Sequence, residues 1–345
     1  MNPVTLARNA MATRFEIVLH GSDPAALRAA GEEALDEIDR LESQLSLYRP
    51  GSEIAQLNAR AAREAVRVTP ETFALLEHAQ RLHAESGGAF DITLAPLVRC
   101  WGFMGTAHQG RVPSEEELEQ ARAVIGMNLV QLNAHNRTVR FDREGVMLDL
   151  GAIGKGYALE RAAGLLREAG VISALLHGGT STVCAIGTPP GANHWQVAIH
   201  RPNTQRGDSL SPVGNGGEGW GEEVLKNART TGKFQLLATV PLKDESLSVS
   251  AVWGRSFEAG GKRFGHVLDP RTGRPVSGVV IAAIVLPSAT ETDALSTALL
   301  VRGRDWLEPL AAARPGMRAL VGWEDGKGFG FQALGITTIS TQKAR

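Results

Sequence analysis

Two oxygen-bearing side chains, Asp293 and Thr297, stand four positions apart in the segment ETDALSTALLV at 291–301. Its apolar spacing predicts a helix, on which residues i and i+4 share one face. A carboxylate beside a hydroxyl suits a hard cation such as Mg²⁺, with water and phosphate oxygens filling the other positions. The alternative is that Asp293 caps the helix and Thr297 is an ordinary helical residue. Taken alone, the segment favours this alternative.

A glycine-rich turn at 148–161, LDLGAIGKGYALER, is the second candidate. The pattern predicts a strand, a tight turn and then a helix with Lys155 at its start. The free N–H groups and the dipole at a helix N-terminus attract anions, phosphate above all. The turn is too short for a Walker loop, and Gly156 stands where that motif needs Ser or Thr. A plain strand–helix turn with a solvated lysine is therefore an equally good interpretation.

A carboxylate within an apolar run is the third candidate. Asp91 lies in GGAFDITLAPLVRCWGF at 87–103, where its charge would be costly without hydrogen-bonding partners. The alternative, which this segment alone favours, is that Asp91 or Thr93 caps a short helix.

The fourth candidate is a histidine, His266, in RFGHVLDPRTGRPV at 263–276. It ends a short predicted strand and precedes the turn DPRTG. A lone histidine is more often structural than catalytic, but functional groups tend to lie beside such turns. Arg263 and Arg271 would favour the neutral form that a general base needs.

Length and composition limit the classes of protein that can hold these groups. The chain has 345 residues, of which 43% are hydrophobic and 21% charged, so we expect a globular protein with a large core. The formal net charge of −1 argues against binding to nucleic acid or an anionic membrane surface. Cys100 and Cys184 are too few for a zinc cluster and are predicted to be reduced thiols.

Neither a membrane span nor a signal peptide is visible in the sequence. No apolar stretch reaches the roughly 20 residues that a span requires, and the first residues lack an apolar region with a cleavage site. We therefore expect a cytoplasmic protein, although a trimmed exported form would look the same.

Hydrophobic periodicity predicts the elements that must position the candidate residues. Expected strands cover 14–20, 128–133, 138–141, 146–149, 171–179 and 279–287. Expected helices cover 27–45, 70–86, 114–124, 289–301 and 306–313, besides the one that Lys155 opens. Because helices and strands mix without regular βαβ alternation, the predicted class is α+β. Residues 203–234, with seven glycines and no sustained period, are predicted to be a surface insertion or mobile loop.

Taken in order, these motifs resemble the ApbE family of FAD:protein FMN transferases. The resemblance runs from MATRFEIVLHG and LSLYRPGSEIAQLN through GGAFDITLAPLVRCWGF, LDLGAIGKGYALER and HGGTSTVCAIG to GHVLDPRTGRPV and TDALSTALLV. It implies a single domain over 1–345, with mixed sheets flanked by helices and a flavin-nucleotide cleft between two lobes.

The resemblance also implies roles for individual residues. The implied contacts with the flavin nucleotide are Met11, Ser46, Tyr48, Phe90, Asp91, Lys155 and Tyr157. The implied Mg²⁺ ligands are the carbonyl of Gly154 and the side chains of Asp293 and Thr297, and His266 matches the general base.

The implied reaction is Mg²⁺-dependent transfer of FMN from FAD to a Thr or Ser hydroxyl of an acceptor flavoprotein, with release of AMP. Hydrolysis of FAD to FMN and AMP is the second hypothesis, because the same metal site would serve both reactions. The third is an FAD-binding protein without catalysis. It is motivated by Ser250-Ala251-Val252, which stands where the family has Thr-Ser-Gly. A second departure from the family pattern is Gly178-Gly179-Thr180 in place of Gly-Gly-Asp.

Overall fold

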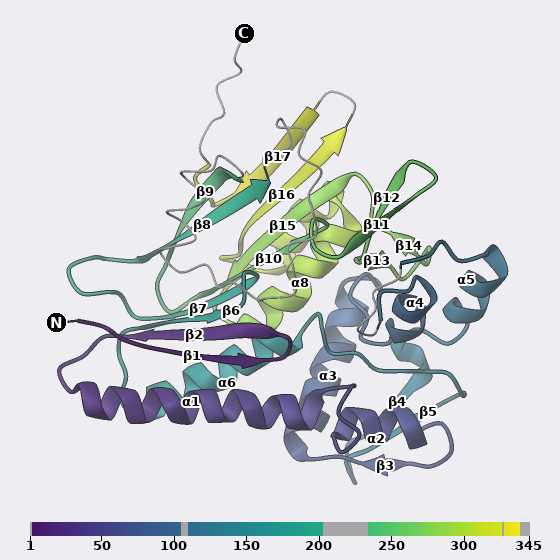
Figure 1. Cartoon of the computed structure of the whole chain (residues 1–345), viewed down its shortest axis with the longest axis horizontal. Helices are drawn as coiled ribbons and strands as arrows, with labels where there is room; N and C mark the ends of the chain where they lie inside the picture. Colours follow the sequence, from purple (N-terminus) through teal and green to yellow (C-terminus); the bar gives the residue numbers. More distant parts are fainter. Residues whose placement is uncertain (1, 105–109, 203–233, 326–327, 339–345) are drawn as a thin grey trace.

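An antiparallel sheet of eight strands forms the centre of the structure (Figure 1). The computed structural model describes residues 2–104, 110–202, 234–325 and 328–338. Every described strand pair in this sheet is antiparallel. The strands follow one another across the sheet in the order β1 (Val4–Ala10), β2 (Thr13–Leu19), β6 (Ala174–Gly178), β7 (Thr182–Ile186), β10 (Ser246–Ala251), β15 (Val279–Leu286), β16 (Arg318–Asp325) and β17 (Gly328–Leu334).

Strand β15 is buried along its whole length because both faces of the sheet are covered. Side chains alternate across a strand, so Ala282 and Ile284 pack into one hydrophobic core while Ile281 and Ala283 pack into the other. An apolar run without polar alternation is typical of such a strand.

Helices cover one face of the sheet, and a strand pair covers the other. Helix α6 (Gly154–Glu168) packs between α1 (Pro24–Leu45) and α8 (Ala289–Arg302), and α8 packs on β10 and β15. On the opposite face, β8 (Trp195–Pro202) and β9 (Phe234–Leu242) pair with each other and contribute the second core.

Shorter elements gather beside α1 and α8 (Figure 1). A three-stranded sheet has the order β3 (Val66–Arg67), β5 (Thr138–Phe141) and β4 (Val130–Asn133). The helices of this part are α2 (Glu53–Arg60), α3 (Pro70–Glu85), α4 (Ala95–Cys100) and α5 (Glu115–Arg122), with the 3₁₀ turn Met127–Leu129. After α8 come the 3₁₀ turn Arg304–Trp306 and α9 (Leu307–Ala313).

Two small hairpins flank His266 in the chain. They are β11 (Ser256–Ala259) with β12 (Lys262–Gly265), and β13 (Leu268–Asp269) with β14 (Arg274–Pro275). Phe257 and Phe264 of the first hairpin contact the ring of Trp101, whose indole N–H donates to the carbonyl of Gly273 at 2.8 Å. These contacts attach the chain around His266 to the end of α4.

The predicted α+β class is confirmed, and most predicted elements occur close to their expected bounds. The predicted strand at 146–149 is wrong, because no strand lies there. A side chain replaces the strand partner: the Asn58 amide donates to the carbonyl of Leu148 at 2.9 Å and accepts from its N–H at 2.7 Å. The predicted surface insertion or mobile loop at 203–234 lies, apart from Phe234, outside the described residues.

Cys100 and Cys184 are both free thiols, as the sequence predicts. In the described part of the chain, no helix combines the length and the apolar character needed to cross a membrane.

Asn58→Ala should destabilise the protein, because it removes both hydrogen-bonding partners of the Leu148 main chain. We expect the free energy of unfolding in urea to fall by about 1–3 kcal/mol. The control is Asn193→Ala, at an exposed asparagine that makes no side-chain hydrogen bond within the described residues. Equal stability of the two variants would show that the Asn58 amide does not hold this segment.

Candidate functional site

The N-terminus of α6 meets the side of α8 at Asp293. This aspartate is only 4% exposed, and its Oδ2 accepts a hydrogen bond from the N–H of Gly156 at 3.0 Å. Gly156 is the third residue of α6, so its N–H has no acceptor within the helix. Asp293 therefore caps α6 from another helix, where the helix dipole also favours a negative charge. Its predicted alternative role as the cap of its own helix is wrong, because Ser288 is the N-cap of α8.

Gly156 is required at this junction for steric reasons. A Cβ atom there would lie 2.2 Å from the carbonyl oxygen of Ala289 and 2.7 Å from the Cβ of Asp293. The second glycine of the GKG sequence is thus explained by close helix packing, and this contact brings the carboxylate to the main chain of α6.

Lys155 places a positive charge beside the same carboxylate. Its Nζ lies 3.8 Å from Oδ1 of Asp293 and donates to the carbonyl of Gly151 at 3.3 Å. The side chain is about one quarter exposed, so it remains accessible to a ligand. The structure thus places a lysine of the glycine-rich turn beside the carboxylate of α8.

Thr297 lies one helical turn after Asp293 and donates its hydroxyl to the Asp293 carbonyl at 3.3 Å. The hydroxyl of Ser250 in β10 lies 3.0 Å from Thr297 Oγ1 and 2.8 Å from Ser296 Oγ. Ser250 belongs to the segment that departs from the family pattern, and it nevertheless supplies a hydroxyl to this cluster.

Gly154, the predicted metal ligand, is the first residue of α6, and helix geometry directs its carbonyl toward residue 158. Its role as a ligand stays a prediction. The carbonyl of Ala152 is different. The N–H of Gly156 bonds to Asp293 instead of to this carbonyl, and no hydrogen bond to it occurs in the described residues.

His266 is held by the main chain of Arg255. The backbone N–H of His266 donates to the Arg255 carbonyl at 3.0 Å, and its ring Nδ1 lies 3.1 Å from the same oxygen. A carbonyl can only accept, so Nδ1 carries the hydrogen and Nε2 has the free lone pair of a base. Beneath the ring, a Cβ on Gly254 would come within 2.8 Å of His266 Cε1.

The surroundings of His266, which is partly exposed, favour its neutral form. Desolvation lowers the pKa of its imidazole to about 4, although the hydrogen bond to the Arg255 carbonyl opposes this shift. The positive charges of Arg255 and Lys155 lower the pKa further. The predicted neighbours were different: Arg271 pairs with Asp269 at 2.7 Å, and Arg263 donates to Ser256 at 2.9 Å.

Asp149 and Arg255 belong to this charged group and were missed in the sequence. Desolvation raises the pKa of the Asp149 carboxyl, while the Gly151 N–H, Lys155 and Arg255 act in the opposite direction. Asp149 accepts that N–H at 2.8 Å. Asp149 could have been noticed in the sequence because it directly precedes the glycine-rich turn. No sequence pattern indicates a role for Arg255.

Tyr48 lies near the same charges. Burial and the negative charge of Asp149 raise the pKa of its phenol, and Arg255 opposes them. The side chain is nevertheless 62% exposed, the most open large ring near the site. Ser46, the C-cap of α1, accepts the Tyr48 N–H at 3.2 Å and so shapes this segment.

Met11 lies in a two-residue turn between β1 and β2. Met11 and Ala12 have φ values of 49° and 57°, a left-handed conformation that costs free energy for residues other than glycine. Half-buried Met11 packs on the main core. Thr13, the residue after this turn, lies against Gly179, at which a Cβ would lie 2.2 Å from Thr13 Oγ1. The turn therefore lies at the end of the sheet where β7 begins.

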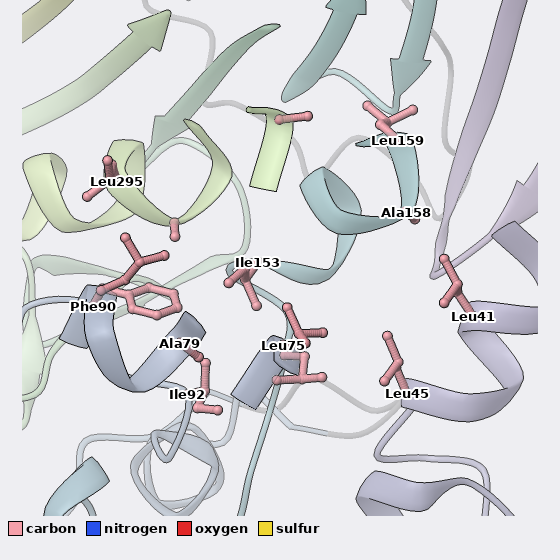
Figure 2. Packing of buried hydrophobic residues seen from close by; sticks show 14 of the residues in the cluster. Leu41, Leu45, Leu75, Ala79, Phe90, Ile92, Ile153, Ala158, Leu159 and Leu295 are labelled. Atoms are coloured by element: carbon pink, nitrogen blue, oxygen red, sulfur yellow. The ribbon is translucent and has the colours of Figure 1, made fainter. Parts of the chain in front are cut away.

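Phe90 and Asp91 are both buried. Phe90 is 1% exposed and lies among core side chains from α3 and α8 (Figure 2). Asp91 accepts from the N–H and hydroxyl of Thr93 at 2.7 and 2.6 Å and lies 3.5 Å from His83 Nδ1. Burial raises the pKa of its carboxyl, and His83 opposes that shift. Asp91 therefore stabilises a turn through Thr93 and does not cap helix α4.

Tyr157 is separated from the other predicted contacts. Residues two apart in a helix do not share a face, and Tyr157 lines a pocket of about 380 Å³ with Pro70, Glu71 and Arg161. Burial raises the pKa of its phenol, and Glu71 and Glu37 act in the same direction. Lys155 lies beside Asp293 and acts on the pKa of His266, and Tyr48 lies near Asp149 and Arg255, whereas Tyr157 lines a separate pocket.

Comparison with known proteins identifies the family. Residues 11–321 match the model of the ApbE family. This chain belongs to the ApbE family. It is 29% identical over 274 residues to the FAD:protein FMN transferase of Vibrio cholerae, covering 78% of this chain and 73% of that protein. It is 31% identical to the one from Treponema pallidum, covering 89% and 81%.

Solved structures of the ApbE family have the same fold. The crystal structure of the ApbE protein of Thermotoga maritima has a TM-score of 0.78 and 29% identity, covering 96% of this chain and 97% of that one. The apo flavinyl transferase ApbE of Pseudomonas stutzeri has a TM-score of 0.77 and 27% identity, covering 97% and 95%.

Gly156→Ala should damage the junction of α6 and α8, because its Cβ would collide with the main chain at Ala289. We expect a loss of about 1–3 kcal/mol in the free energy of unfolding. Gly164→Ala is the matched control in the same helix, since a Cβ there meets nothing within 4 Å. Alanine's higher helix propensity should make this control neutral or stabilising. A tolerated Gly156→Ala would refute the proposed close contact.

The ring of His266 should titrate with a midpoint near pH 4, because its pKa lies far below the usual value. Above that pH the neutral ring should carry its hydrogen on Nδ1. Nitrogen NMR of the histidine side chains measures both properties, and loss of the signal in His266→Gln assigns it. A midpoint near 6.5, or hydrogen on Nε2, would contradict the geometry described.

Proposed function

We propose that this chain transfers FMN from FAD to a Thr or Ser hydroxyl of an acceptor protein, with release of AMP. The names of its relatives support the reaction class. The structural observation that carries the proposal is the group of Lys155, Asp293 and neutral His266 around the N-terminus of α6. A helix N-terminus, a lysine and a carboxylate able to hold a cation are parts from which a diphosphate site can be built.

The donors present fit Mg²⁺. Asp293 offers a carboxylate, Thr297 a hydroxyl and Ala152 a main-chain carbonyl without a hydrogen bond among the described residues. These are hard oxygen ligands, and Mg²⁺ commonly takes only one or two carboxylates and retains several waters. No cluster of three or more His, Cys, Asp or Glu side chains suited to a metal occurs in the described ranges. When bound, the ion would neutralise charge on the phosphates.

His266 is proposed as the general base. Its free Nε2 would take the proton of the acceptor hydroxyl as the hydroxyl oxygen bonds to the phosphorus of the FMN half of FAD. The bond between that phosphorus and the bridging oxygen breaks, and the oxygen leaves with AMP. Water in place of the hydroxyl would give free FMN and AMP, the hydrolysis hypothesis.

The remaining predicted contacts divide into two groups. Tyr48 and Lys155 lie beside the proposed diphosphate site and are proposed to touch FAD, with Met11 and Ser46 at its edge. Phe90 and Asp91 are proposed to act indirectly, because both are buried. Tyr157 has no part in this proposal, since it lines a pocket beside α3.

The direct test is incubation of the protein with FAD, Mg²⁺ and a panel of candidate acceptor domains, followed by mass spectrometry of the acceptor. We expect an FMN adduct on Thr or Ser and an equal amount of AMP. His266→Ala should slow adduct formation by about 10²–10⁴-fold, since it removes the base, with little change in FAD binding.

Asp293→Ala should abolish adduct formation, because it removes the only carboxylate proposed to hold the ion. Glu33→Ala, at an exposed position of α1, is the control. AMP and free FMN without an adduct would support hydrolysis instead, and intact bound FAD in the presence of Mg²⁺ would support an FAD-binding protein.

A further inference from the structure

Thr182, the first residue of β7, has a fully buried hydroxyl that lies against the predicted metal ligand. Its Oγ1 is 3.3 Å from Oδ1 of Asp293, the oxygen that Gly156 does not engage. Thr182 has no exposed surface, and the next four residues of β7 are Val183, Cys184, Ala185 and Ile186. A hydroxyl in such surroundings is costly unless it forms a hydrogen bond, and a valine would fill the same space without that cost.

The number of hydroxyl hydrogens available decides which group accepts the hydrogen bond from Thr182. Thr292 donates to the carbonyl of Ala289 at 2.9 Å, so it can only accept from Ser248, which lies 2.9 Å from it. Ser248 thereby uses its single hydrogen and has none for Thr182, 3.3 Å away. The hydrogen of Thr182 is then free for Asp293, and an ionised carboxylate is the stronger acceptor.

The two oxygens of Asp293 are thus held from two different elements. Gly156 of α6 donates to Oδ2, and Thr182 of β7 donates to Oδ1. Two donors on the two oxygens fix the rotation of the carboxylate plane, which a single hydrogen bond does not. Each oxygen keeps a further lone pair for a ligand.

We propose that Thr182 is a positioning residue that orients the Asp293 carboxylate for a divalent cation. The inference rests on the proposed function, because it takes Asp293 to be a metal ligand. Groups that hydrogen-bond a ligand side chain typically alter metal affinity by about 10–100-fold when removed.

The experiment titrates Mn²⁺ alone into the full-length protein and follows the electron paramagnetic resonance signal of the free ion. Thr182→Val removes the hydroxyl and keeps the shape, and we expect it to raise the Kd for Mn²⁺ by about 10–100-fold. Thr182→Ser restores the hydroxyl and should bind as the wild type does. Thr180→Val, at an exposed threonine two positions earlier, should also leave the Kd unchanged.

Wild-type affinity in a folded Thr182→Val variant would overturn the inference while leaving the metal site and the reaction intact. A purely structural threonine would lower the melting temperature without changing the Kd. Thr182→Ala provides a second test if the valine variant does not fold, with the same expected loss of affinity. Failure of the wild type to bind Mn²⁺ would instead refute the proposed metal site, and this inference with it.

Discussion

The buried carboxylate of Asp293 at the N-terminus of α6 is the interaction on which the site depends. A buried charge is stable only with compensating partners, and here a helix N–H, a threonine hydroxyl and a nearby lysine provide them. The first of these partners requires α6 and α8 to approach closely, which only a glycine at position 156 permits. The close contact at Gly156 therefore serves two purposes. It packs α6 against α8 on the sheet, and it brings the Asp293 carboxylate to the N-terminus of α6.

The proposed base is positioned by main-chain atoms more than by side chains. The carbonyl of Arg255 fixes the orientation and the hydrogen of His266, and Gly254 leaves room for its ring. The side chains that surround it set its charge, because burial and the cations Arg255 and Lys155 all favour the neutral imidazole. A histidine held in this way is unprotonated at neutral pH without a carboxylate partner, and its low pKa makes it a weaker base than a free imidazole.

Sequence patterns predicted local structure and single residues better than they predicted contacts between distant segments. The spacing of Asp293 and Thr297 correctly indicated a shared helix face, because that depends only on helix geometry. The strand predicted at 146–149 failed because the amide of Asn58 satisfies the main chain there. The family resemblance implied that Tyr157 joins Lys155 at the ligand, yet Tyr157 lines a separate pocket beside α3. Asp149, Arg255 and Thr182 acquire their roles only from the folded arrangement, which no local pattern contains.

The central claim is that the junction of α6 and α8 forms a cation-dependent diphosphate site. Anomalous diffraction from crystals of the protein soaked with FAD and Mn²⁺ tests it most directly. The account predicts a manganese peak bonded to the Asp293 carboxylate and the Thr297 hydroxyl, with the diphosphate beside Lys155. A manganese peak elsewhere, with Asp293 still bonded only to Gly156 and Thr182, would contradict it.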